Sequence, residues 1–235
     1  PERLVVFGDV HGDHDALVSL LEAAGILDAA GAWAGGAAHL VSLGDLLDRG
    51  PDSRAVMDLL MRLQEEAAAA GGQVHVLVGN HELMNLTGDL RYVAPEEYAA
   101  FAGPRDDALR AEALARSRSL GLAEETVRDR PPGFFAHRAA FLPDGRYGAW
   151  LLAQRTLVVI GDRLFAHGGA SPVLLRGPAE TLEPRIRARL RELVAWRTDP
   201  LLQRPDRLDV DLFAADELGE ARLGTGLETF AGDPW

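Results

Sequence analysis

The sequence predicts a layered α/β fold, because strand-like and helix-like segments alternate three times over residues 1–90. No internal repeat and no low-complexity linker divides the 235 residues. A chain of this length can bury a sizeable core, and its 47% apolar and 26% charged residues are an ordinary globular composition. We therefore expect one domain over residues 1–235.

Three short apolar runs, each followed by a glycine, are expected to be buried strands: residues 4–7, 39–43 and 74–78. Residues 13–24 carry apolar side chains at helical spacing behind a suitable N-cap, Asp13. A second helix is expected over residues 53–70, where Gly71-Gly72 is a common C-terminal signal. Strands and helices in this order favour a parallel sheet covered by helices.

The alternation stops after Leu90. Residues 95–120 are polar-rich and predict helix, whereas residues 128–148, which contain Pro131-Pro132-Gly133, are expected to be loop. We interpret about 91–155 as a cap-like insertion over the site rather than as core. Regular structure is expected again in a hairpin over residues 156–160 and 164–166 and in a helix over residues 181–197.

Charge and composition exclude several functions. The net charge of -12 argues against a protein that coats nucleic acid, because binding the phosphate backbone needs clustered positive charge. The chain has no lysine, which excludes a Walker-type phosphate loop and Schiff-base catalysis. It has no cysteine, which excludes thiolate metal sites and disulfides.

The sequence also bears on location. No apolar run reaches the length needed to cross a bilayer, so we expect no membrane partner. A cytoplasmic location is the expectation, with a periplasmic one left open because the sequence begins at Pro1 without an initiator Met.

Side chains of the kind that bind metals follow the expected strand ends: Asp9, His11, Asp45, Asn80, His81 and His167. The carboxyl ends of strands are where α/β folds place their ligands, and the glycines there let the backbone turn sharply. One Asp-x-His pattern alone would be weak support. Four such strand ends in order, all with oxygen or imidazole ligands, predict a site for Mn, Fe or Zn.

Four motifs resemble the block motifs of the calcineurin-like metallophosphoesterases: Gly8-Asp9-Val10-His11-Gly12, Gly44-Asp45-Leu46-Leu47-Asp48-Arg49-Gly50, Gly79-Asn80-His81-Glu82 and His167-Gly168-Gly169. The Asp-Arg-Gly and Asn-His-Glu forms resemble the phosphoprotein phosphatase branch. The run over residues 164–169 is most similar to the bacterial Shewanella-like protein phosphatases. The motifs follow the family order over about two-thirds of the chain.

This resemblance implies a sandwich of two mixed β-sheets flanked by helices, with two metal ions at the strand ends. Asp9 and His11 would hold the first metal, Asp45 would bridge, and Asn80 and His167 would hold the second. Manganese is the expected metal, with iron and zinc as the other choices.

The resemblance also implies hydrolysis of a phosphomonoester by direct in-line attack of a hydroxide that bridges the two metals. Arg49 would clamp two phosphoryl oxygens, and His81 would protonate the leaving alkoxide as general acid. Asp48 would orient the His81 ring. The expected substrate is a phosphorylated Ser, Thr or Tyr side chain of a protein or peptide, and no nucleic acid.

One departure concerns the end of the chain. The family carries a further ligand His on a late strand, and no His follows His167 here. Residues 230–235 resemble the stretch that precedes that strand, so we expect the last strands, with a second phosphate-binding arginine, to lie beyond residue 235. Two alternatives stay open: a dinucleoside polyphosphate hydrolase of the same superfamily, and a non-catalytic phosphate-binding scaffold.

The remaining histidines have structural interpretations. His14 is expected at a solvent-facing helix start, His39 and His75 inside strands, and His137 in a loop packed on aromatic rings. Glu82 is expected to support the site through hydrogen bonds or to cap a helix. Two motifs fail on context, the acidic run over residues 209–211 and the glycine run over residues 224–226.

Overall fold

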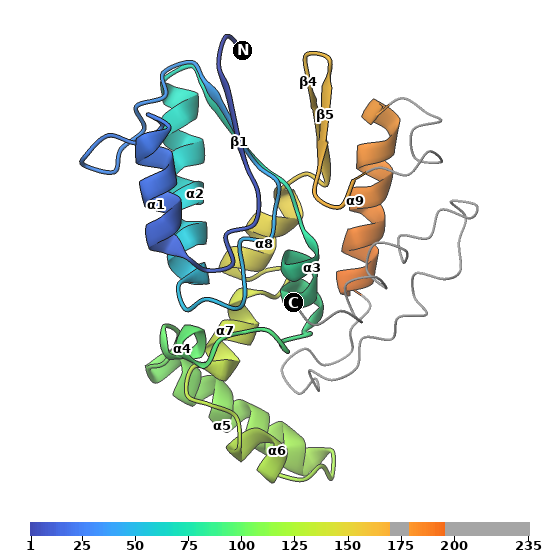
Figure 1. The fold of residues 1–235 in the computed structure, drawn as a ribbon. Coiled ribbons are helices and arrows are strands. Elements are labelled where there is room, and N and C mark those ends of the chain that lie inside the picture. Colours follow the sequence, from blue (N-terminus) through green and yellow to red (C-terminus); the bar gives the residue numbers. More distant parts are fainter. Residues whose placement is uncertain (170–178, 196–235) are drawn as a thin grey trace.

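The computed structural model of the protein describes residues 1–169 and 179–195. Strands β1 (Leu4–Phe7), β2 (His39–Ser42) and β3 (Gln73–Val76) form a parallel sheet with β2 in the centre (Figure 1). All three strands therefore end at the same edge of the sheet, and the motifs that follow them are brought together there.

Two helices cover one face of this sheet, α1 (His14–Ala23) and α2 (Ser53–Ala69) (Figure 1). The Asp13 side chain accepts a hydrogen bond from the Ala16 amide at 3.0 Å, which confirms the expected N-cap. Both helices bury an apolar stripe at helical spacing in the main core: Leu17 and Leu21 in α1, and Val56, Leu60 and Leu63 in α2.

The hairpin of β4 (Leu157–Ile160) and β5 (Arg163–Ala166) is antiparallel, as expected. A single parallel bridge joins Leu77 to Arg155, and the Val78 amide donates to the Arg155 carbonyl at 2.9 Å. This bridge ties the hairpin base to the end of β3. Because β5 returns to the level at which β4 begins, His167 reaches the same sheet edge as the earlier motifs.

Helix α3 (Asn80–Thr87) begins directly at the third motif and has Gly79 as its N-cap. The sequence did not predict this helix, because its first turn consists of the polar site residues and shows no apolar periodicity. Asn80 and His81 therefore lie in the first turn of a helix rather than in an irregular loop.

The insertion is helical throughout most of its length. It contains α4 (Pro95–Ala99), α5 (Pro104–Ser119), α6 (Glu125–Arg128), α7 (Phe134–Ala140) and α8 (Arg146–Ala153). Helix was expected over residues 95–120 and is confirmed, with a break before Pro104. The expectation of loop over residues 128–148 is wrong, because α7 and the start of α8 lie there. Residues 134–139 are all buried, so α7 shows no polar face by which sequence periodicity could find it.

The insertion contributes to two cores. Its first part forms a cluster of its own, in which α5, α6 and α7 pack on one another and project away from the sheet (Figure 1). The expectation that the insertion lies outside the core is wrong for its second part, which joins the main core through Phe141, Tyr147 and Leu151. Helix α8 and the turn before it are therefore anchored to the same core as α1 and α2.

Helix α9 (Ala179–Ala195) packs against α3, α8 and β4, close to the expected helix over residues 181–197. Among the described helices, none combines the length and the apolar character that a membrane span requires. The motifs at residues 209–211 and 224–226 and the stretch 230–235 lie outside the described residues.

Candidate active site

The backbone at the site adopts conformations that side chains rarely tolerate. Within residues 1–169 and 179–195, the non-glycine residues with positive φ are His11 at 50°, Asp45 at 53°, Asp48 at 70° and Arg49 at 66°. All four belong to the predicted site. Such left-handed residues cost energy and cluster where function requires a particular direction of a side chain.

Hydrogen bonds between the loops hold this strained backbone. The amides of Val10 and His11 both donate to the Asp45 carbonyl, at 2.9 and 3.0 Å. A Cβ atom at Gly50 would collide with the His11 carbonyl, and one at Gly79 would collide with the Asp45 side chain. Glycine is therefore needed at both positions for the loops to approach so closely.

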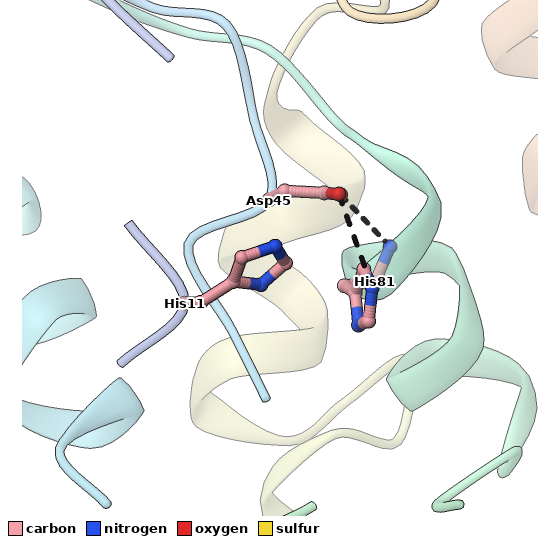
Figure 2. Close-up of side chains that lie close together, drawn as sticks. All are labelled: His11, Asp45 and His81. Carbon is pink, nitrogen blue, oxygen red and sulfur yellow. Dashed lines mark hydrogen bonds and ion pairs between the residues drawn. The ribbon is translucent and has the colours of Figure 1, made fainter. Parts of the chain in front are cut away.

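Asp45 lies at the centre of two groups of ligand-type side chains. One group is His11, Asp45 and His81, and the other is Asp9, Asp45 and His167. Within each group the potential ligand atoms lie within 4.8 Å of one another. Figure 2 shows the first group, with the His11 and His81 rings on either side of the buried Asp45 carboxylate. A carboxylate shared by two groups is what a metal bridge requires.

The histidine rings are oriented as in metal sites. His11 Nδ1 donates to the Leu47 carbonyl at 3.0 Å, and His167 Nδ1 donates to the Leu43 carbonyl at 3.0 Å. A carbonyl oxygen only accepts, so each ring carries its proton on Nδ1 and turns Nε2 toward the cluster. This hydrogen bond to the second nitrogen is the usual support of a metal-binding histidine.

Three acceptors converge at the second group. His167 Nε2 lies 2.9 Å from Asn80 Oδ1 and 3.3 Å from Asp45 Oδ2. Lone pairs at such distances repel unless a proton or a cation lies between them. The donor set of carboxylate, amide oxygen and imidazole suits a divalent metal, so the residues fit the predicted ion.

The electrostatics of this group favour a positive charge. Burial alone would raise the pKa of Asp45, but the hydrogen bond and charge of His167, with those of His81, outweigh it and lower that pKa. Burial opposes a charge on His167, yet the hydrogen bond and charge of Asp45 raise the His167 pKa to about 8. The site thus prefers an anionic Asp45 with a cation beside it.

His81 is held by a buried carboxylate. Asp48 Oδ2 accepts from His81 Nδ1 at 2.7 Å, and the Asn85 amide donates to Asp48 Oδ1 at 2.9 Å. The opposite ring nitrogen, Nε2, faces Asp45 Oδ2 at 4.0 Å. Burial would lower the His81 pKa, but the hydrogen bond to Asp48 and the charges of Asp45 and Asp48 raise it. The ring therefore directs an N–H group toward the Asp45 cluster.

Glu82 fastens the second and third motifs together. Its carboxylate accepts from the backbone amides of Asp45 and Leu46, both at 2.8 Å, and from that of Gly79 at 2.7 Å. Burial and the charge of Asp45 raise the Glu82 pKa, while these three donors oppose the rise. Glu82 both supports the site and caps α3, so both expected roles are confirmed.

Arg49 and Tyr92 lie at the rim of the site. The Arg49 amide donates to the Tyr92 carbonyl at 2.8 Å, and the Arg49 side chain is exposed. The Tyr92 ring lies 5.3 Å from the His81 ring, centroid to centroid. Tyr92 was not found from the sequence, because it lies in the short connection between α3 and α4, which contains no motif.

The other histidines are not part of the Asp45 cluster. His14 begins α1 and lies 3.4 Å from Asp15, at the expected helix start. His39 and His75 lie in neighbouring strands, with ring nitrogens 3.1 Å apart. His137 is packed on aromatic rings as expected, but it lies in helix α7 rather than in a loop.

The α/β sheet with candidate metal ligands at its carboxyl edge is the arrangement typical of one class of protein, the metal-dependent phosphoesterases. Residues 2–211 match the family model described as calcineurin-like phosphoesterase. The chain belongs to the calcineurin-like phosphoesterase family, as the motif resemblance implied.

Two relatives indicate the branch of the family. Shewanella-like protein phosphatase 2 of Arabidopsis thaliana is 36% identical over 183 residues, which cover 72% of this chain and 46% of that protein. Shewanella-like protein phosphatase 1 of Plasmodium berghei is 34% identical over 167 residues, which cover 71% of this chain and 39% of that protein. The chain thus spans less than half the length of these relatives.

A solved structure extends the similarity to the fold. The cold-active protein-tyrosine phosphatase of a psychrophilic Shewanella species superposes with a TM-score of 0.59 at 31% identity. The match covers 97% of this chain and 62% of that one. The expected α/β class and metallophosphoesterase fold are confirmed.

Proposed function

We propose that the chain is the catalytic part of a metal-dependent protein phosphatase that hydrolyses phosphomonoesters of Ser, Thr or Tyr side chains. The observation that carries this proposal is the position of Asp45. It is shared by two ligand groups and lies beside the Asp48–His81 pair. The relatives named as protein phosphatases support a protein or peptide substrate.

In this proposal Asp9 and His11, with the Asp9 carboxylate 3.7 Å from His11 Nε2, would hold one metal. Asp45 would be shared by both metals, and Asn80 and His167 would hold the second. Two bound cations supply neutralisation of the phosphoryl oxygens and activation of a water molecule. Manganese is the proposed metal, because the ligand set combines hard oxygen atoms with imidazole. The hydrogen bonds from Nδ1 of His11 and His167 to backbone carbonyls leave Nε2 of each ring available to bind a metal.

Arg49 binds the phosphoryl group of the substrate in this proposal. Its backbone is held in the left-handed region beside Asp48 and fixed by the Tyr92 carbonyl, while its guanidinium is exposed. A planar guanidinium can donate two parallel hydrogen bonds to a phosphoryl group, which orients the phosphorus atom toward the metals.

His81 donates a proton to the leaving oxygen. Asp48 accepts the Nδ1–H bond, which leaves the Nε2–H group facing the Asp45 cluster. When the P–O bond breaks, the proton on Nε2 moves to the departing alkoxide or phenolate oxygen. Asp48 is a positioning residue for that step, because it touches His81 rather than the substrate.

The experiment that tests the proposal measures metal content and turnover of one protein under matched conditions. Metal-stripped protein is loaded with Mn, Fe or Zn and assayed on p-nitrophenyl phosphate and on phosphoserine and phosphotyrosine peptides. We expect about two ions per chain and restored turnover with Mn. Turnover of dinucleoside polyphosphates with none of phosphopeptides would contradict the protein-phosphatase assignment.

Asp45→Asn is the variant that tests the bridge. Replacing the shared carboxylate by an amide should lower metal content to about one ion or fewer and reduce turnover at least about 100-fold. Asp162→Asn in the exposed turn of the β4–β5 hairpin is the matched control and should behave as the parent protein. Parent-like activity and metal content in Asp45→Asn would overturn the bridging assignment.

A further inference from the structure

A buried acid–imidazole pair lies behind the active site. Glu97 of α4 and His137 of α7 both come from the insertion, and both side chains are fully buried. Glu97 Oε1 lies 3.4 Å from His137 Nε2. None of the four polar atoms of the pair meets a described partner in good hydrogen-bond geometry.

The surroundings of the pair keep both members uncharged. Burial raises the Glu97 pKa to about 8, helped by the charges of Asp48 and Asp52, while Ser53 opposes the rise. Burial and the charge of Arg138 lower the His137 pKa to about 3, against a smaller opposing effect of Asp48. At pH 7 the pair therefore consists of a carboxylic acid and a neutral imidazole.

The rest of the shell around His137 is aromatic. Its ring lies 5.1 Å from the Tyr98 ring, 5.1 Å from the Phe101 ring and 4.7 Å from the Phe141 ring. These contacts hold the plane of the His137 imidazole beside the buried Glu97 carboxyl group. A neutral carboxyl group buried in this way keeps its proton and its side-chain orientation. Both properties suit a group that positions a neighbouring residue.

Ser53 connects this pair to the catalytic residues. The Ser53 hydroxyl oxygen accepts the Asp48 amide at 3.1 Å, and the same side chain lies against the Glu97 carboxyl group. Ser53 is fully buried. Because its oxygen accepts from Asp48, its own hydrogen is available to donate to Glu97. The Asp48 amide that Ser53 holds belongs to a left-handed residue, with φ of 70°.

The cost of the pair argues for a role beyond filling space. Buried polar groups without good hydrogen bonds destabilise a fold, and apolar side chains of the same volume would be neutral or stabilising there. The aromatic rings around His137 would accept such a replacement.

We propose that Glu97 and His137 form a positioning element for the general acid. The Glu97 carboxyl group lies 3.4 Å from His137 and beside Ser53, Ser53 fixes the Asp48 backbone, and the Asp48 carboxylate holds His81. This inference rests on the proposed role of His81 as proton donor. In this proposal the insertion takes part in catalysis, because residues of α4 and α7 help to set the direction of His81, which lies outside the insertion.

The test compares leaving groups, since a general acid matters most when the leaving oxygen is strongly basic. Glu97→Met keeps the volume and removes the acid. We expect about 10-fold lower kcat on phenyl phosphate but less than about 3-fold on p-nitrophenyl phosphate, with an unchanged or higher Tm. Glu97→Gln keeps a polar group of the same shape and should retain most of the kcat on phenyl phosphate that Glu97→Met loses. Glu96→Met, on the exposed face of α4, is the matched control.

A second variant keeps the test decisive if Glu97→Met does not fold. Ser53→Ala leaves Glu97 in place and removes the connection to Asp48, so it should show the same preference for the activated ester. In a His81→Asn background, neither variant should lower activity further. Equal losses on both esters, or additive losses in that background, would overturn the inference while leaving the role of His81 intact. If His81→Asn itself showed no leaving-group dependence, both assignments would fail.

Discussion

At the residue scale, the His81 ring is fixed by a carboxylate on one nitrogen and by contact with a neighbouring ring. Asp48 binds Nδ1 at 2.7 Å, and the ring faces His11 at a centroid distance of 4.7 Å with an interplanar angle of 77°. The backbone amide of His81 donates to Asp45 Oδ1 at 3.0 Å, so the residue proposed to bridge the metals also fixes the start of the helix that carries the proposed proton donor. In the proposed mechanism, metal binding and proton donation therefore both depend on the Asp45 carboxylate.

This arrangement predicts how His81→Asn affects different substrates. Asparagine keeps a hydrogen-bonding side chain but has no proton to transfer, so phenyl phosphate should lose about 100-fold in kcat. p-Nitrophenyl phosphate should lose about 10-fold or less, because its leaving group needs little protonation. Steady-state kinetics at saturating Mn gives both values. An equal loss on the two esters would assign His81 to metal binding instead.

The role of a single residue could be predicted from the sequence at some positions and not at others. The groups around Asp45 were predictable, because short motifs bring them to strand ends that meet at one sheet edge. Tyr92 and Glu97 were not, since Tyr92 follows no motif and Glu97 stands in a Pro-Glu-Glu run typical of an exposed helix start. The burial of Glu97 and the direction of Tyr92 depend on long-range packing of the insertion, which local sequence patterns do not reveal.

At the element scale, Glu82 joins the loop after β2 to the start of α3. Its buried carboxylate satisfies three backbone donors, the amides of residues 45, 46 and 79. Backbone amides in an irregular loop have no partner in a helix or sheet, and here the Glu82 carboxylate serves as their acceptor. The relative position of Asp45 and Asn80, and hence of two proposed ligands, depends on it.

Glu82→Ala should therefore destabilise the protein. Leaving three buried amides without an acceptor is expected to cost about 2–5 kcal/mol in the free energy of unfolding, measured by urea denaturation. Glu65→Ala, on an exposed position of α2, should change that free energy by about 0.5 kcal/mol or less. A Glu82→Ala protein as stable as the control would show that the loops hold their conformation without this contact.

Whole elements were predictable where their pattern is local. The strands that end at glycine and the amphipathic helices α1 and α2 follow from apolar spacing and caps. Helices α3 and α7 do not, because one begins with polar site residues and the other is buried along residues 134–139. For both, tertiary contacts replace the periodic pattern from which a helix is inferred.

At the scale of the whole molecule, the second part of the insertion and the helices that cover the sheet are stabilised by the same hydrophobic core. The main core includes Phe141, Tyr147 and Leu151 from the insertion together with the apolar faces of α1 and α2. The buried pair of Glu97 and His137 lies between the helices of the insertion and the loop of Asp48. The ionisation of this pair should therefore be seen in the unfolding of the whole domain.

The Glu97 carboxyl group gives a pH dependence with a definite sign. Its folded pKa, about 8, lies above the ordinary value of 4.5, so the stability it contributes is present below pH 4.5 and is lost as the pH rises toward 8. The loss amounts to roughly 1 kcal/mol per pH unit in that window. His137 acts in the opposite direction, with stability lost below its ordinary value of 6.5.

Glu97→Gln isolates the contribution of Glu97, because His137 and the metal ligands are the same in both proteins and cancel in the difference. The variant should gain stability relative to the parent by roughly 3 kcal/mol between pH 5 and pH 8, and by little more above pH 9. Urea unfolding of both proteins across this range, at one metal concentration, gives the difference directly. Parallel curves would mean that Glu97 is ionised in the folded state and that its charge is compensated, which the neutral pair does not allow.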